Sequence, residues 1–304
     1  MAPRHRGTSA PWFAYAALAA AVSGIAWSAI FIRWSDVPGP SSAFYRVAIA
    51  GLVLVPWRCL TGMVMPRERA MIARTSRRAY LLALAGGVFF GLDLALYNTA
   101  VMRTTATTAT LFGNNAPIFV GIGSWLVFRR RPARRFWVGL SVAMCGAVML
   151  LVATARGNAG PNADLTGAAM ALGAAAFFAA YLLATERVRE EMDTLTFNAA
   201  AIVGSIVTVL VVCVVVDAPL AGFSSRTWLA LLGLGLISQL GAYLALTYAL
   251  GHLPATIGSV GLLAQIPCTA LLAMLLLGEP LTLPYVGGGI LVLIGIYIVT
   301  VGSR

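Results

Sequence analysis

The sequence predicts an all-α integral membrane protein with ten transmembrane helices, arranged as two inverted five-helix repeats. Of its 304 residues, 60% are hydrophobic and only 10% are charged, whereas about one quarter of a soluble domain is charged. The apolar residues also come in blocks of about twenty, the length that a helix needs to cross a hydrocarbon core of about 30 Å. Finally, the second half of the chain repeats features of the first half.

The first half contains five apolar blocks, separated by charged or Gly/Pro-rich breaks. The opening segment MAPRHRG resembles the basic start of a secretory signal peptide, but the apolar run that follows is too long for one. We therefore expect this run to form the first helix. The fourth block ends at the arginine-rich run FRRRPARR. The five predicted spans are 11–33, 42–60, 80–101, 105–128 and 135–154.

The second half contains five further blocks of the same kind. The connections between them are short, so no soluble domain is predicted. The first repeat is expected to cover 11–154 and the second repeat 165–301. The five predicted spans of the second half are 165–185, 195–216, 227–250, 254–278 and 283–301.

A shift of 150 positions superimposes the two halves without gaps. Residues 94–96 (LAL) then coincide with 244–246 (LAL), and Pro117 coincides with Pro267. The proline pair is the stronger signal, because a proline inside a helix removes a backbone hydrogen bond and costs about 3 kcal/mol. Five is an odd number of spans, so the second unit enters the membrane from the opposite side. Inverted repeats of this kind are typical of secondary transporters, which bind substrate near the midplane between the repeats.

The distribution of the arginines predicts the orientation of the chain. All 21 basic residues are arginine, and the net charge of +11 could suggest a nucleic-acid partner. With both termini in the cytoplasm, however, all but five arginines fall on the cytoplasmic side, as the positive-inside rule requires. We therefore expect no nucleic-acid partner. The five exceptions are Arg33, Arg46, Arg103, Arg156 and Arg226.

The sequence carries no recognisable catalytic, metal-binding or nucleotide-binding motif. The two histidines, His5 and His252, fall in the terminal tail and in a loop, and there is no Walker A sequence. We expect no enzymatic activity, no metal and no cofactor. The four cysteines lie in or beside apolar spans without CxxC spacing, so each is expected to be a small buried hydrophobic residue. They are Cys59, Cys145, Cys213 and Cys268.

Several segments resemble the drug/metabolite transporter superfamily, specifically its ten-helix members with two EamA-type repeats. SGIAWSAIFIRWS and SSAFYRVAIAGLVLVP are similar to the family's first two helices, including the arginine of the second helix, here Arg46. ATTATLFGNNAPIFVGIGSWLVF is similar to its fourth helix. PATIGSVGLLAQIPCTALLAMLLLGEPLT and GGGILVLIGIYIV are similar to its ninth and tenth helices. The resemblance covers nearly the whole chain.

This resemblance implies export of small metabolites, amino acids or drugs from the bacterial cytoplasm, with the protein in the inner membrane. One position departs from the family pattern: the glutamate that often ends the fourth helix aligns with Arg129. Glu279 is therefore interpreted as an interfacial end group. The four-helix multidrug relatives use a glutamate in their first helix, but residues 11–33 contain no acidic residue. That drug/proton mechanism is not carried over.

Two charged residues inside predicted spans are the first candidates for a substrate site. A charge at the bilayer centre costs about 2.5 to 3.5 kcal/mol, so it needs a partner or a function. Arg46 and Asp93 lie at similar depth. In one interpretation, Arg46 binds an anionic group of the substrate, while Asp93 exchanges a proton or balances Arg46 between substrates. In the other, the two residues form a permanent structural ion pair.

Amides and aromatic residues form a second group of substrate-binding candidates. Asn114, Asn115 and Gln265 lie at equivalent levels of the two repeats, beside the prolines, where they could line a cavity or bond across helices. Glu186 and His252 are expected to be solvated. The weaker candidates, for which packing is the alternative role, are Asn98, Ser238, Gln239, Trp27, Tyr97, Tyr181 and Tyr243.

These observations favour a secondary active exporter of small polar solutes that works by alternating access, driven by proton or solute exchange. The alternative is a non-transporting membrane assembly or receptor subunit, with a membrane-embedded enzyme as a remote third hypothesis. The expected partners are the transported small molecule and membrane lipid. A homodimer is left open, because the sequence contains nothing that decides the oligomeric state.

Overall fold

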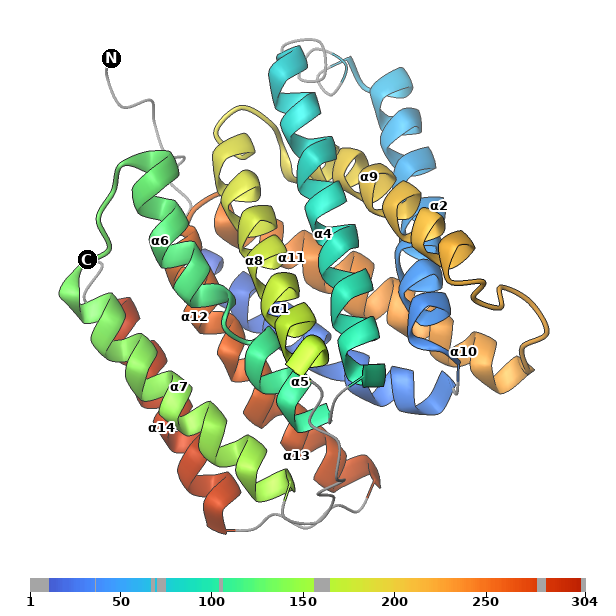
Figure 1. Ribbon diagram of the computed structural model, residues 1–304. Coiled ribbons are helices and arrows are strands. Elements are labelled where there is room, and N and C mark those ends of the chain that lie inside the picture. The colour runs from blue at the N-terminus through green and yellow to red at the C-terminus, as the bar shows by residue number, and fades with distance from the viewer. Residues whose placement is uncertain are drawn as a thin grey trace.

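Every secondary-structure element in the described part of the chain is helical (Figure 1). The computed structural model describes residues 11–35, 37–66, 69, 75–103, 106–155, 165–277 and 283–301. Glu279 and the segment 1–10, both named above, lie outside the described residues. The predicted all-α class therefore holds for the described chain.

The helices follow the predicted apolar blocks closely. In the first half they are α1 (Pro11–Ser35), α2 (Gly39–Val64), α4 (Arg77–Arg103), α5 (Ala106–Gly113), α6 (Ala116–Phe128) and α7 (Arg134–Ala155). In the second half they are α8 (Leu165–Val188), α9 (Thr194–Val215), α10 (Ser225–Gly233), the π-helix η1 (Leu234–Gly241), α11 (Ala242–Leu250), α12 (Ala255–Gly261), the 3₁₀ turn η2 (Leu262–Ala264), α13 (Gln265–Leu277) and α14 (Leu283–Val301).

Seven of the described helical stretches are long and apolar enough to cross a membrane. Two further apolar helices, Ala116–Phe128 and Val286–Val301, are shorter. These helices also expose many large apolar side chains on the outside of the bundle. The chain is therefore a multi-pass membrane protein. The seven stretches are Trp12–Ile32, Gly39–Val64, Arg77–Ala100, Leu165–Val188, Thr194–Val215, Ser225–Leu250 and Ala255–Leu276.

Two spans are interrupted just before a proline, as the positions of the prolines suggest. The helix that would join α5 to α6 breaks at Asn114 and Asn115, and Pro117 is the second residue of α6. The span from α12 to α13 tightens into the 3₁₀ turn η2, and Pro267 is the third residue of α13. Because proline lacks a backbone N–H, the helical pattern is weakest immediately before it. The breaks leave polar backbone and amides inside the bundle.

Helices from the two halves pack directly on one another. α4 packs along α8 and α9, while α1 packs along η1 and α11, and α7 packs along α14. Lipid supplies no hydrophobic drive between helices, so such contacts need small residues that let backbones approach. Gly87 of α4 meets the backbone of Ala201 in α9 in this way.

The cysteines partly contradict their predicted burial. Cys213 is buried and its Sγ lies 3.3 Å from the carbonyl oxygen of Pro40, whereas Cys59 and Cys145 are exposed on the outside of the bundle. The outer surface of a membrane helix is itself apolar, so an apolar sequence context does not distinguish a core position from a lipid-facing one.

Candidate functional site

A buried arginine, Arg46 of α2, lies between the two halves of the chain. The residue is 8% exposed, and its Nε donates a hydrogen bond of 2.6 Å to Oε1 of Gln239 in η1. Its guanidinium carbon lies 5.5 Å from the centre of the Tyr243 ring, within the range of a cation–π interaction. Asp93 of α4, which is also among the described residues, does not form an ion pair of 4.0 Å or less with Arg46. A neutral amide and an aromatic ring therefore hold the charge.

Asp93 of α4 lies between two residues of the same helix that contact other helices. Phe90, one turn before it, has its ring centre 4.8 Å from that of Tyr243. Tyr97, one turn after it, has its hydroxyl 3.2 Å from Oγ1 of Thr110 in α5. Residues three and four apart share a helix face, so Asp93 faces the region between the Tyr243 ring and the end of α5.

The π-helical segment η1 brings Gln239 close to α2. A Cβ built on Gly235 would lie 2.7 Å from Cβ of Ile49, so the absence of a side chain permits this approach. The hydroxyl of Ser238 is fully buried and has no hydrogen-bond partner among the described residues. π-Helical segments recur at functional sites, because the wider turn redirects side chains. Ser238 and Gln239 were predicted from the sequence as site candidates, whereas the π-helix that contains them was not.

The amides predicted at one depth do lie beside each other. Nε2 of Gln265 lies 3.5 Å from Oδ1 of Asn114, so the two interrupted spans meet at their breaks. Asn114 Nδ2 also donates to the carbonyl oxygen of Thr110 at 2.8 Å, and Asn115 Nδ2 donates to that of Phe112 at 3.1 Å. These side chains therefore satisfy backbone oxygens at the break.

Other predicted site residues occupy supporting positions. Asn98 Nδ2 donates to the carbonyl oxygen of Gly39 at 3.0 Å and ties α4 to the start of α2. Trp27 stacks on a phenylalanine of its own helix, α1. Tyr181 is 2% exposed and packs against Tyr243 with ring centres 6.1 Å apart. It therefore supports the ring that contacts Arg46.

A small cavity lies beside Gln239. Its volume is about 10 Å³, close to the minimum that holds one water. A larger solute therefore requires the surrounding helices to separate. The lining residues come from α2, α4, α8, α9 and η1: Leu54, Phe90, Tyr181, Asn198, Ala201, Ile202, Ser205, Gln239 and Leu240.

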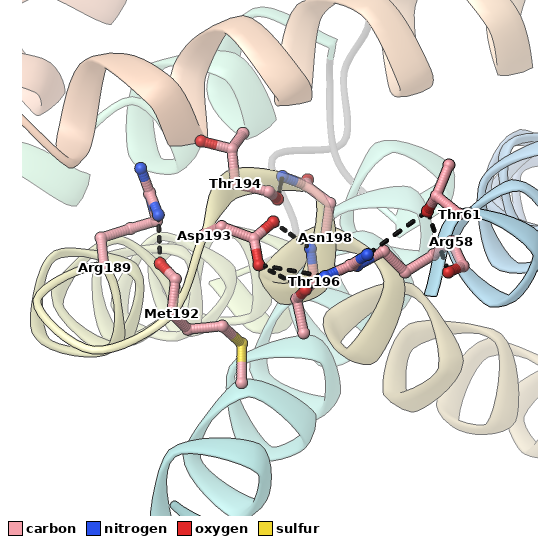
Figure 2. A network of polar contacts seen from close by, with 8 residues as sticks. All are labelled: Arg58, Thr61, Arg189, Met192, Asp193, Thr194, Thr196 and Asn198. Atoms are coloured by element: carbon pink, nitrogen blue, oxygen red, sulfur yellow. Dashed lines mark hydrogen bonds and ion pairs between the residues drawn. The ribbon is translucent and has the colours of Figure 1, made fainter. Parts of the chain in front are cut away.

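A polar network links α2 to the connection between α8 and α9 (Figure 2). Arg58, 5% exposed, donates from Nε to Oγ1 of Thr196 at 2.6 Å and from Nη2 to Oδ2 of Asp193 at 3.3 Å. Asp193 in turn caps α9 by accepting from the backbone N–H of Thr196 at 3.0 Å. Arg189 donates from Nε to the carbonyl oxygen of Thr247 at 3.3 Å. Charged groups therefore join the two halves at this end of the bundle.

The environment of Asp193 favours its ionised form. Burial alone would raise the pKa of this carboxyl, but the side-chain and backbone hydrogen bonds from Thr196 and the nearby charges of Arg58 and Arg189 lower it below its ordinary value. Burial lowers the pKa of Arg189. The carboxylate therefore stays charged, pairs with Arg58 and lies within the electrostatic range of Arg189.

Glu186 is not solvated, contrary to the prediction from the sequence. Its side chain is 11% exposed, accepts from the backbone N–H of Ala255 at 2.8 Å, and lies 3.4 Å from Nη1 of Arg130. The start of α12 and the arginine-rich loop after α6 therefore converge on this carboxylate. His252, also expected in solvent, is half-buried, with Nδ1 2.9 Å from the carbonyl oxygen of Tyr248.

The network around Arg58 was not predicted, because the arginines near helix ends were interpreted only as signals of orientation. One signal was available: Asp193 and Thr196 stand three apart directly before an apolar block, the spacing of a helix N-cap. That pattern identifies a fixed carboxylate, but the pairing with Arg58 spans 135 positions and depends on the fold.

Comparison with known proteins points to transporters. The chain is 26% identical over 234 residues to the uncharacterized transporter YwfM of Bacillus subtilis, covering 74% of this chain and 75% of that protein. It is 29% identical over 281 residues to the threonine/homoserine exporter RhtA of Salmonella typhimurium, covering 88% of this chain and 82% of the exporter.

A solved structure and a family profile also match the chain. A protein of known crystal structure superimposes with a TM-score of 0.77 at 18% identity, over 96% of this chain and 98% of its own. The profile of the EamA-like transporter family matches twice, over residues 10–152 and 165–301. The resemblance to drug/metabolite transporters is thereby confirmed, and the chain belongs to the EamA-like transporter family.

Proposed function

We propose that this protein is a secondary active transporter that exports small carboxylate-bearing metabolites, foremost amino acids, by alternating access. Proton or solute exchange drives the export, since the sequence offers no nucleotide-binding motif. Membership of a transporter family supports the general activity. The similarity to a threonine/homoserine exporter supports amino acids as the first substrates to test.

The proposal includes ten spans in two inverted repeats, 11–154 and 165–301. The packing pairs support this arrangement, because exchanging the repeats turns several of them into other observed pairs. In this exchange α4 corresponds to the span of η1 and α11, α8 corresponds to α1, and α9 corresponds to α2. The contact of α4 with α8 therefore corresponds to the contact of η1 and α11 with α1, and the contact of α4 with α9 corresponds to that of η1 with α2. The two interrupted spans, α5–α6 and α12–α13, also exchange. Equivalent helices that pack equivalently are what an in-plane pseudo-twofold produces.

We place the protein in the bacterial inner membrane, with both termini in the cytoplasm. Arginine-rich helix ends in the described part of the chain support this orientation through the positive-inside rule. They lie around residues 77–78, 129–135 and 187–189. The Arg58 network and Glu186 then lie at the cytoplasmic end, and Arg46 lies nearer the periplasmic end.

The observation that carries the proposal is Arg46. A buried guanidinium held by an amide and an aromatic ring is costly in a membrane unless an anion joins it. A substrate carboxylate would supply that charge and accept hydrogen bonds from the guanidinium. Asp93, which faces the same interior region, would exchange a proton or balance Arg46 between substrates.

Counterflow in proteoliposomes tests the proposal. Amino acids and matched amines that lack the carboxylate are offered to the wild type and to Arg46→Gln. We expect exchange of amino acids by the wild type and a loss of about tenfold or more in the variant, since a charge-assisted hydrogen bond is lost. Arg226→Gln, which removes an exposed arginine at the start of α10, serves as the matched control.

Two results would contradict the proposal. If the folded wild type moves none of the solutes, the non-transporting assembly or receptor subunit becomes the better hypothesis. If Arg46→Gln exchanges amino acids as fast as Arg226→Gln, Arg46 does not bind the carboxylate. Melting temperature and gel filtration of each variant separate these results from misfolding.

A further inference from the structure

A second pocket, separate from the Arg46 region, lies between the two halves at the arginine-rich end. Its volume is about 210 Å³. Segments that meet there are the end of α6, the loop before α7, the end of α8, the start of α12 and the end of α14. Its polar lining consists of Ser124, Arg130, Arg131, Arg135, Glu186 and Thr256.

The charges around this pocket are unbalanced. Three arginines line it, against a single carboxylate, Glu186, which is already engaged by Arg130 and by the backbone N–H of Ala255. Arg135 lies in the first turn of α7, which contains no acidic residue, at the helix end that itself carries partial positive charge. An anion in the pocket would offset both.

The arginine side chains are held in place by neighbouring rings. The guanidinium carbon of Arg130 lies 5.7 Å from the centre of the Phe128 ring, and that of Arg131 lies 5.5 Å from the centre of the Trp125 ring. Such contacts position the charged groups before any ligand arrives. Ordered guanidinium groups bind phosphate oxygens more readily than freely moving ones.

A hydroxyl in the lining supports a ligand beside the charges. Ser124 of α6 is 6% exposed and lines the pocket. Its hydroxyl can donate a hydrogen bond to a phosphate oxygen.

The surface beside the pocket indicates where such an anion comes from. The residues that follow Ser124 are apolar and exposed: Trp125 is 49% exposed, Leu126 is 69% exposed and Val127 is 60% exposed. On a membrane helix these side chains face lipid. Acyl chains can therefore lie along α6 while the headgroup enters the basic pocket, the arrangement by which such pockets bind acidic lipids.

We propose that this pocket binds the phosphate of an acidic phospholipid headgroup of the cytoplasmic leaflet. The assignment to the cytoplasmic leaflet rests on the orientation given under the proposed function. The binding of the lipid does not depend on that orientation. A chain that transports nothing would still bind the lipid, so the two proposals can fail separately.

Native mass spectrometry of the purified full-length protein tests the assignment. The protein is incubated with phosphatidylglycerol or with phosphatidylcholine of the same acyl chains, and the retained lipid is counted. We expect preferential retention of phosphatidylglycerol, and a loss on the order of tenfold in the double variant Arg131→Gln/Arg135→Gln. Arg130 is left intact because it pairs with Glu186. The control Arg77→Gln/Arg78→Gln removes two exposed arginines from the same end, outside the pocket.

Ser124→Ala provides a test that leaves every charge in place. We expect it to weaken retention of phosphatidylglycerol roughly fivefold through the lost hydroxyl. Equal retention by all variants, or equal loss in the control and the pocket variant, would overturn the site in favour of diffuse surface attraction. Inorganic phosphate that binds as tightly as the lipid would overturn the lipid assignment and indicate a soluble anion.

Discussion

At the scale of single residues, Asp193 holds more contacts than its position in a short connection suggests. It caps α9 and pairs with the buried Arg58. We expect Asp193→Asn to lower the free energy of unfolding by about 2 kcal/mol, because hydrogen bonds to a charged group are lost and Arg58 stays buried without its counter-charge. Melting temperature in detergent measures the effect. Glu190→Gln, which removes half of an exposed ion pair in the same connection, is the control and is expected to change stability by less than about 1 kcal/mol.

The pKa of Asp193 predicts how acid affects stability. Because hydrogen bonds and arginine charges lower the pKa in the folded protein, its contribution is complete above the unfolded value of about 4 and disappears as the pH falls through the lower folded value. We expect the melting temperature of the wild type to fall more steeply below about pH 4 than that of Asp193→Asn. Parallel curves would show that this carboxyl does not carry the acid sensitivity.

At the scale of helices, the pair α7–α14 depends on glycine. A Cβ on Gly146 would lie 2.5 Å from the carbonyl oxygen of Gly288. We expect Gly146→Ala to destabilise the protein by about 1 to 3 kcal/mol, because the backbones must separate. Gly173→Ala is the matched control: its Cβ would lie 3.6 Å from a Leu96 methyl group, an ordinary contact, so the helix-favouring alanine is tolerated. Thermal melting compares the two, and equal stability of both variants would contradict tight packing of α7 on α14.

Among the helices, the apolar spans and their proline interruptions could be predicted from the sequence, whereas the π-helix and the contacts between distant helices could not. Hydropathy located the helices because lipid demands long apolar runs, and Pro117 and Pro267 marked two interruptions because proline cannot donate a backbone hydrogen bond. The π-helix η1 was not predictable, since its sequence is as apolar as its neighbours. The bond between Arg46 and Gln239 was missed because it joins residues 193 positions apart and arises only when α2 packs on η1.

At the scale of the whole molecule, different kinds of bond close the two ends of the bundle. At the proposed periplasmic end, Ser41 and Tyr45 of α2 donate to the carbonyl oxygens of Pro219 and Leu220. At the proposed cytoplasmic end, the contacts involve charged groups, with Arg58 bound to Asp193. Charge-assisted hydrogen bonds are stronger than neutral ones. Alternating access requires each end to open in turn, so we expect the cytoplasmic end to need the larger input of free energy.

Weakening the cytoplasmic contacts should therefore expose the central cavity to the cytoplasm. Asn198→Cys places a thiol at the cavity wall, in a background whose four native cysteines are replaced by alanine. In inside-out vesicles we expect Asp193→Asn to raise its labelling by a membrane-impermeant maleimide several-fold, because the closed state loses the stabilisation from Arg58. Arg77→Gln, which removes an exposed charge from the same end, should leave labelling unchanged. Equal labelling with and without Asp193 would mean that the Arg58 network stabilises the fold without closing the cavity.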